Sequence, residues 1–170
     1  MLFRSDVGLD ILDNTLSFYI RSINLAVSRD LDERLDGLEV ARGTGKITTL
    51  LMVDSHPGIR PSTIAKMSLH DRSAMARLID QMERQGLLRR GVSAEDGRAQ
   101  ELFITQKGAA LARRVRGLVN AQSREFFHFL PEPEHKQAIG ILRRVYRRIA
   151  GLDAGSLDEG GAAEGASDDA

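Results

Sequence analysis

The sequence contains no cysteine among its 170 residues. A chain without thiols forms neither disulfides nor zinc–thiolate sites, and it cannot sense oxidants through a thiolate. It also has no run of about 18 apolar residues of the kind that crosses a bilayer. The first residues lack the apolar core and small-residue cleavage site of a secretory signal. We therefore expect a soluble, cytoplasmic protein.

Groups of side chains suited to catalysis or metal binding are also missing. The sequence contains no serine elbow and no two-cysteine deaminase signature, so nucleophilic catalysis has no candidate residue. The histidines form no close pair, and without cysteine a zinc site would need distant carboxylates. These histidines are His56, His70, His128 and His135. We expect neither an enzyme nor a protein that depends on a metal or cofactor.

The formal net charge of zero conceals an uneven distribution of charge. Residues 153–170 hold six acidic residues and no basic one, and otherwise consist mostly of Gly, Ala and Ser. Such a segment has too little apolar surface to offset its ordering entropy, so residues 151–170 are predicted to be a disordered acidic tail. The rest of the chain has 18 acidic residues against 24 Lys and Arg, a net charge of +6. This excess suggests a polyanionic partner.

Long apolar stripes lie near both ends of the chain. One helix is predicted over residues 8–35, another follows Thr105 to about Leu130, and Pro131 and Pro133 separate it from a last one. The stripes of the first and last helices comprise Leu9, Leu12, Leu16, Ile20, Ile23, Val27 and Leu31, and Ile139, Leu142, Val145, Tyr146 and Ile149. A small middle region cannot cover them, so we expect a symmetric dimer. The alternative is a monomeric helical bundle.

Three shorter helices are predicted between these ends. Thr44 is expected to cap a helix that stops near His56, and Pro61 begins the next, because proline suits the first helical turn. Asp71 is expected to cap a further helix, closed by Gly86. The last two, joined by a tight turn, form a helix-turn-helix, whose second helix can enter the major groove of DNA.

The helix after Asp71 is amphipathic in a way that suits DNA binding. Its inward face comprises Met75, Leu78, Ile79 and Met82, and its opposite face comprises Arg72, Ser73, Ala76, Arg77, Asp80 and Arg84. Small and basic residues near its N-terminus let the backbone approach DNA while the arginines reach outward. Ser62 and Thr63, at the start of the preceding helix, are placed to contact phosphate. The alternative is an ordinary solvated helix face.

A hairpin with a basic tip follows this helix. The strand-like runs "LLRRGV" and "ELFIT" flank Asp96 and Gly97, a dipeptide that favours a tight turn. Beside a recognition helix in the major groove, Arg98 would reach the minor groove, where narrow A·T tracts attract a guanidinium. Asp96 would brace Arg98 and shape the turn. The alternative is that Arg98 only solvates a loop tip.

Residues 59–108 resemble the multiple-antibiotic-resistance regulator (MarR) family of bacterial winged-helix repressors. The matches are "DRSAMARLIDQMERQGLL", "EDGRA" and "ITQKG", and the resemblance extends over about residues 8–150. It implies a mainly α fold with a small β-hairpin wing in one domain, 1–150. The winged helix-turn-helix lobe would cover residues 36–104, and the dimerisation helices residues 8–35 and 105–150. The DNA-contacting positions of the family fall on Ser62, Thr63, Arg72, Ser73, Ala76, Arg77 and Arg98.

The resemblance implies a ligand-responsive transcriptional regulator that binds double-stranded DNA as a homodimer, more often a repressor. A cleft between the dimer helices and the DNA-binding lobe would hold the effector. The residues of the first helix near that level are Tyr19, Arg21 and Ser22, beside apolar neighbours. An arginine among apolar walls suits an aromatic carboxylate or its coenzyme A thioester. Alternatively, Arg21 makes an intramolecular salt bridge. For the whole protein, the alternative is a winged-helix protein–protein interaction module without DNA binding.

Overall fold

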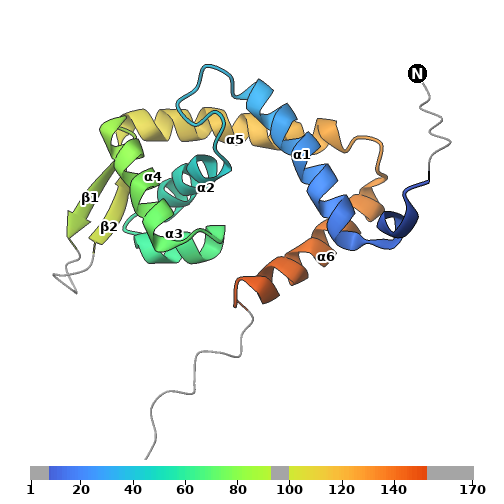
Figure 1. The fold of residues 1–170 in the computed structure, drawn as a ribbon. Helices are drawn as coiled ribbons and strands as arrows, with labels where there is room; N and C mark the ends of the chain where they lie inside the picture. Colours follow the sequence, from blue (N-terminus) through green and yellow to red (C-terminus); the bar gives the residue numbers. More distant parts are fainter. Residues whose placement is uncertain (1–7, 93–99, 153–170) are drawn as a thin grey trace, which may run out of the picture. The chain divides into compact units, whose positions relative to one another are not determined.

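The computed structural model of the chain describes residues 8–92 and 100–152 (Figure 1). A mainly helical chain with one antiparallel hairpin is observed, which confirms the predicted fold class. The elements are η1 (Asp10–Asn14), α1 (Leu16–Arg34), α2 (Thr44–Ser55), α3 (Pro61–Ser68), α4 (Arg72–Arg84), β1 (Leu88–Val92), β2 (Gln100–Ile104), α5 (Gln106–Phe126) and α6 (Glu132–Ile149). Among the described residues, those up to His128 form one compact unit, and those from Phe129 onward form another.

The single helix predicted over residues 8–35 is wrong, because the chain breaks at Thr15. The 3-10 helix η1 ends there, and Thr15 adopts extended φ and ψ angles of −111° and 105°. Its hydroxyl donates a hydrogen bond to the carbonyl of Ile11 at 2.7 Å. Local bonds of this kind from Ser, Thr, Asn and Asp compete with helical ones. Apolar periodicity therefore continues across residues 9–31 although the helix does not.

Three other helix ends differ from the prediction by a few residues. Gly43, and not Thr44, is the N-cap of α2. The last long helices also start or stop earlier than expected: α5 ends at Phe126, and α6 includes Pro133 in its first turn. Proline costs little there, because the first N–H groups of a helix have no partner inside it.

The core of the first unit lies among α2, α3, α4, α5 and the hairpin. In the hairpin, Leu88 pairs with Ile104 and Val92 pairs with Gln100. Ile59, just before α3, forms an isolated bridge to Leu102, so the hairpin is tied to the helix-turn-helix. The largest fully buried side chains of this core include Leu50, Val53, Ile64, Met75, Ile79, Met82, Leu87, Leu88, Leu102 and Val115.

The helices α3 and α4 both end at a residue in the left-handed backbone conformation, but the residue type differs. After α4, Gly86 has a φ of 69°, and the N–H of Leu87 donates to the carbonyl of Met82 at 3.0 Å. After α3, Leu69 takes the corresponding place with a φ of 56°, and the N–H of His70 donates to the carbonyl of Ala65 at 3.0 Å. Glycine adopts this left-handed conformation without strain, whereas leucine does not.

Replacing Leu69 by glycine is expected to stabilise the protein. The leucine side chain is 56% exposed, so little packing is lost, while relief of the left-handed backbone favours the folded state by about 1 kcal/mol. The melting temperature should rise by about 2–4 °C. Leu69→Ala is the control: it keeps the Cβ atom and should bring no gain. A lower melting temperature for Leu69→Gly would mean that the leucine packs against something in the folded protein.

Candidate nucleic-acid interface

The helices α3 and α4 pack together through the tight turn at residues 69–71 (Figure 1). The start of α4 is set locally by Asp71, whose carboxylate accepts a hydrogen bond from the N–H of Ala74 at 2.7 Å. This bond lowers the pKa of Asp71. Both the predicted cap and the helix-turn-helix are therefore confirmed as structure.

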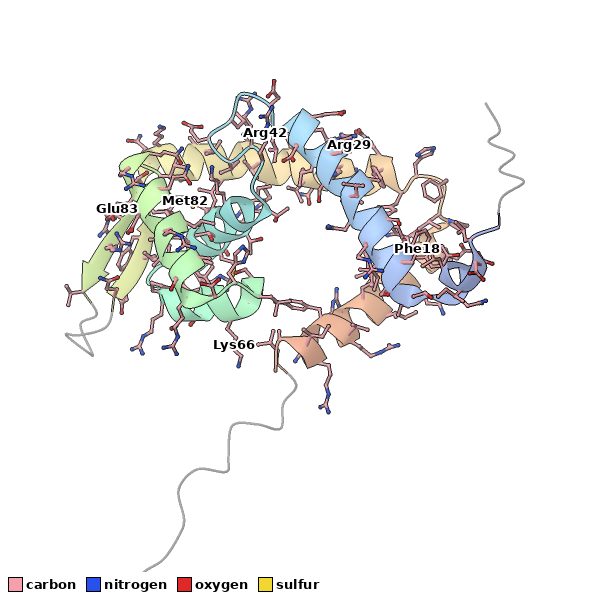
Figure 2. All side chains as sticks on the ribbon, in the orientation of Figure 1. Phe18, Arg29, Arg42, Lys66, Met82 and Glu83 are labelled. Carbon is pink, nitrogen blue, oxygen red and sulfur yellow. The ribbon has the colours of Figure 1, made fainter. Side chains whose placement is uncertain are left out.

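The structure separates the two faces of α4 as the spacing predicts. Met75, Ile79 and Met82 are buried and Leu78 is partly covered. Figure 2 labels Met82 on α4. The residues that the family resemblance assigned to DNA contact, and that lie within the described segments, are all exposed: Ser62, Thr63, Arg72, Ser73, Ala76 and Arg77.

A cavity of about 410 Å³ brings part of this set together. Ser62 of α3 and Arg72 and Ala76 of α4 line it, beside Arg90 of β1 and Gln100 of β2. Residues from two helices and the wing thus share one hollow on the exposed side of the helix-turn-helix. Thr63, Ser73 and Arg77 lie on the same helices outside this hollow.

Arg90 lines the candidate site, and sequence reasoning missed it. Its guanidinium contacts the carboxylates of Asp80 and Glu83 on α4, and its backbone N–H donates to Glu83 at 3.3 Å. These contacts raise the pKa of Arg90, the hydrogen bond to Asp80 having the largest effect. Figure 2 shows Glu83 on the part of α4 that lies next to β1. The ion pairs hold the wing on α4 and neutralise Asp80, which the sequence had placed simply on the outer face.

The tip of the wing cannot be compared with its prediction. Asp96, Gly97 and Arg98 lie outside the described residues, so the minor-groove role of Arg98 stays a prediction. The base of the wing supplies another cation: Cζ of Arg89 lies 4.4 Å from the centre of the Phe103 ring. A guanidinium at this distance is attracted to the face of the ring.

The predicted effector residues Tyr19, Arg21 and Ser22 are exposed on α1, next to Phe18, which Figure 2 labels. The hydroxyl of Tyr19 donates to Asp13, and this bond raises the pKa of Tyr19. Arg21 makes no ion pair with any residue of the described segments, which disfavours the intramolecular salt bridge. A cavity of about 580 Å³ lies further along α1, around Arg29 and Arg42, and does not include the three predicted residues.

The described segments show neither a metal-binding cluster nor a membrane span. Within residues 8–92 and 100–152, no three of the His, Asp and Glu side chains are grouped so that they could hold a metal ion. No helix in the same segments combines the length and the low charge that crossing a membrane requires.

Known proteins share both sequence and fold with this chain. Residues 38–99 match the model of the MarR family. The chain is 29% identical over 133 residues to a protein of Thauera aromatica that is described as a putative transcriptional regulatory protein for the hcr operon. The aligned residues cover 78% of this chain and 80% of the relative. The structure of the transcriptional regulator SlyA is 25% identical with a TM-score of 0.70, over 78% of this chain and 94% of SlyA.

Two structures of proteins named CouR share the fold. CouR bound to a 23-mer DNA duplex has a TM-score of 0.76 at 23% identity, over 84% of this chain and all of CouR. CouR of Rhodococcus jostii RHA1 bound to p-coumaroyl-CoA has a TM-score of 0.71 at 19% identity, over 87% of this chain and 98% of CouR. With its helix-turn-helix and its hairpin wing, the chain has the fold of these winged-helix regulators, and its residues 38–99 match the MarR family.

Proposed function

We propose that this protein is a homodimeric repressor that binds a pseudo-palindromic DNA operator and releases it when a small aromatic effector binds. The observation that carries DNA binding is the exposed surface of α3 and α4, where Ser62, Arg72 and Ala76 share one cavity and Arg77 lies on the same helix. Small side chains beside arginines let a helix approach base edges closely. CouR, which shares this fold, has been seen bound to a 23-mer DNA duplex, and this supports the proposal.

The same surface argues against an interaction module that has lost DNA binding. Such a module has no need for cations at the positions where a recognition helix meets phosphate and bases. Here Arg72 and Arg77 are both exposed, and neither makes an ion pair with the residues that the structure describes. The acidic neighbour Asp80 is occupied by Arg90.

Replacing Arg77 by alanine tests the DNA contact. If Arg77 reads a base, affinity for the operator should fall by about 1–3 kcal/mol and discrimination at one base pair should weaken. If it contacts only phosphate, affinity should fall equally for all sequences, and the slope of log affinity against log salt should drop by about one. Fluorescence anisotropy at several salt concentrations separates the two cases.

Arg84→Ala is the matched control for this measurement. Arg84 is exposed on the same helix, in its last turn, about 10 Å further along the axis than Arg77. A recognition helix contacts bases with its N-terminal residues, so the loss for Arg84→Ala should be smaller. If Arg77→Ala binds with wild-type affinity, or if both variants lose affinity equally, Arg77 makes no specific contact with DNA. The arginines of α4 would then form an ordinary solvated helix face.

The exposed apolar side chains of α1 and α6 support a homodimer. On α1, Leu16 is 70% exposed and Ile23 is 49% exposed; on α6, Leu142 is 54% and Ile149 is 67% exposed. Stripes of this kind on terminal helices are costly in water and are commonly covered by a second copy. We infer that the dimer buries both stripes, and that the two recognition helices are thereby presented to one DNA duplex.

The effector is proposed to bind beside Tyr19, Arg21 and Ser22. In one chain these side chains are exposed, so a second copy that covers α1 would help to enclose them. Arg21 makes no ion pair with the described residues and lies next to apolar neighbours, an arrangement that suits an organic anion with a buried ring. CouR bound to p-coumaroyl-CoA supports an aromatic carboxylate or its coenzyme A thioester as the class of effector. The effector can release the DNA only if it binds the DNA-incompetent state of the protein more tightly than the DNA-competent state.

Titration with p-coumarate and p-coumaroyl-CoA is expected to raise the melting temperature of the free protein and to dissociate its DNA complex. Arg21→Ala should reduce both effects, because the anion loses its partner. Arg113→Ala, which removes an exposed arginine of α5 that lines neither cavity, is the control and should respond like wild type. The assignment is wrong if neither compound stabilises the protein while peroxide or zinc releases the DNA.

A further inference from the structure

A buried amide joins α1 to α5 where these two helices pack together (Figure 1). Gln122 of α5 is only 5% exposed. Its Nε2 donates to the backbone carbonyl of Val27 at 2.8 Å and to a carboxylate oxygen of Asp30 at 3.0 Å, both on α1. An amide taken out of water is costly unless its hydrogen bonds are made. These bonds are made only when α1 and α5 lie in one register.

Two further side chains extend this contact. Arg34 of α1 donates from Nε to Asp30 at 2.8 Å and from Nη1 to Glu125 of α5 at 2.7 Å. The bond from Arg34 lowers the pKa of Asp30 more than any other influence, and the bond from Gln122 lowers it as well, against the effect of burial. Asp30 is therefore a charged acceptor shared by both helices, and we call Gln122, Asp30, Arg34 and Glu125 the α1–α5 clamp.

The other end of α5 is tied to the DNA-binding lobe. Arg116 pairs with Asp54 of α2 at 2.8 Å. The hydroxyl of Thr105, which caps α5, donates to the carbonyl of Gly86 after α4 at 2.6 Å. Thus α5 is held to the lobe along its first half and to α1 by the clamp. Since α1 carries an exposed apolar stripe, the clamp lies between the lobe and a surface proposed to pair with the second copy.

We propose that Gln122, held by Asp30 and Arg34, is a positioning residue that sets the spacing between the two recognition helices of the dimer. The inference rests on the proposed function, because spacing has meaning only for a dimer on DNA. Apolar contacts between helices tolerate sliding, since dispersion and burial are not directional. A bond from a buried amide to a named backbone carbonyl does not tolerate it. A displacement of one base pair moves a half-site by about 3.4 Å, so the register of α1 on α5 selects which spacing is bound.

Gln122→Met tests the proposal in the full-length protein. Methionine keeps the unbranched shape of glutamine and removes both hydrogen bonds. The ion pair between Asp30 and Arg34 is retained in this variant. Duplexes selected from a random pool by the wild-type protein provide the probe, with one or two base pairs then added or removed between the half-sites. Wild type is expected to lose at least about tenfold in affinity for each altered spacing, equivalent to about 1.4 kcal/mol. The Gln122→Met variant should bind the selected duplex nearly as tightly as wild type does. Its affinity for the duplexes with altered spacing should be less than about threefold lower than for the selected duplex.

Asn120→Leu is the control, because it removes an exposed amide from the same helix and should discriminate spacing as wild type does. If Gln122→Met discriminates as strictly as wild type, or if Asn120→Leu relaxes spacing equally, the proposal is overturned. If Gln122→Met does not fold, Asp30→Ala decides, because it removes the carboxylate that accepts from both Gln122 and Arg34. Relaxed spacing in Asp30→Ala supports the clamp, and strict spacing overturns it. A wild-type protein that selects no duplex would instead refute the proposed function.

Discussion

Replacing Gly108 by alanine is expected to destabilise the DNA-binding lobe strongly. A Cβ atom at this position would lie 2.1 Å from the carbonyl oxygen of Leu87 and 2.8 Å from Cδ1 of Ile104. The Leu87 carbonyl also accepts hydrogen bonds from the backbone N–H and the hydroxyl of Thr105, both at 3.1 Å. The backbone cannot move away without breaking these bonds. We expect a loss of more than about 3 kcal/mol in the free energy of unfolding, measured by urea denaturation.

Gly117→Ala is the matched control on the same helix. Nothing lies within 4 Å of a Cβ atom built at Gly117, which is exposed in α5. Alanine in the interior of a helix is favoured over glycine by about 0.5–1 kcal/mol, so this variant should be slightly more stable than wild type. An unchanged urea midpoint for Gly108→Ala would show that α5 does not pack against the Leu87 backbone as closely as the structure has it.

Inserting five base pairs between the half-sites of the operator is expected to abolish tight binding. In a two-fold dimer the recognition helices enter successive major grooves on one face of the duplex, about 10 bp apart from centre to centre. Half a helical turn moves the second half-site to the opposite face, where the second lobe cannot reach it. Because simultaneous engagement is lost, affinity should fall by at least about 100-fold. Anisotropy titrations of the original and the lengthened duplex measure this loss.

A duplex with a single half-site is the reference for that experiment. It should bind the protein about as weakly as the lengthened operator, because one lobe is engaged in each case. If the lengthened operator binds as tightly as the original, the dimer does not hold its lobes in a fixed two-fold arrangement. The recognition surface of α4 could then still contact DNA, but the palindromic operator would be wrong.

The positions of most helices in the lobe follow from short-range chemistry, and the sequence alone predicted them. Asp71 accepts the N–H of Ala74, Thr105 accepts the N–H of Gly108, and Pro61 occupies the first turn of α3. Each depends on residues within one turn of the chain, which is why propensity and capping rules apply. The amphipathic pattern of α4 likewise determined its buried and exposed faces, and with them the candidate contact residues.

Local rules failed where two local interactions compete. At Thr15 the hydroxyl bond to Ile11 accompanies the break in the predicted first helix, although the apolar spacing continues past it. Leu69 adopts a left-handed conformation that its side chain disfavours, because the turn of the helix-turn-helix requires it. At Thr15 the periodicity indicated a continuous helix, and the helix is broken; at Leu69 the predicted turn forms, but with a backbone conformation that leucine disfavours.

The remaining features depend on residues that meet only in the tertiary structure. Arg90 joins Asp80 and Glu83 across the turn after α4, and Gln122 meets Val27 and Asp30 across 95 and 92 residues. Sequence periodicity does not identify such partners, because an arginine or glutamine can equally well be exposed to solvent as be paired with a distant residue. The sequence by itself determined the elements and the face of α4 proposed to contact DNA. The packing decided how the wing is held and how α1 is registered on α5, because hydrogen bonds and ion pairs between distant segments exist only after the chain has folded.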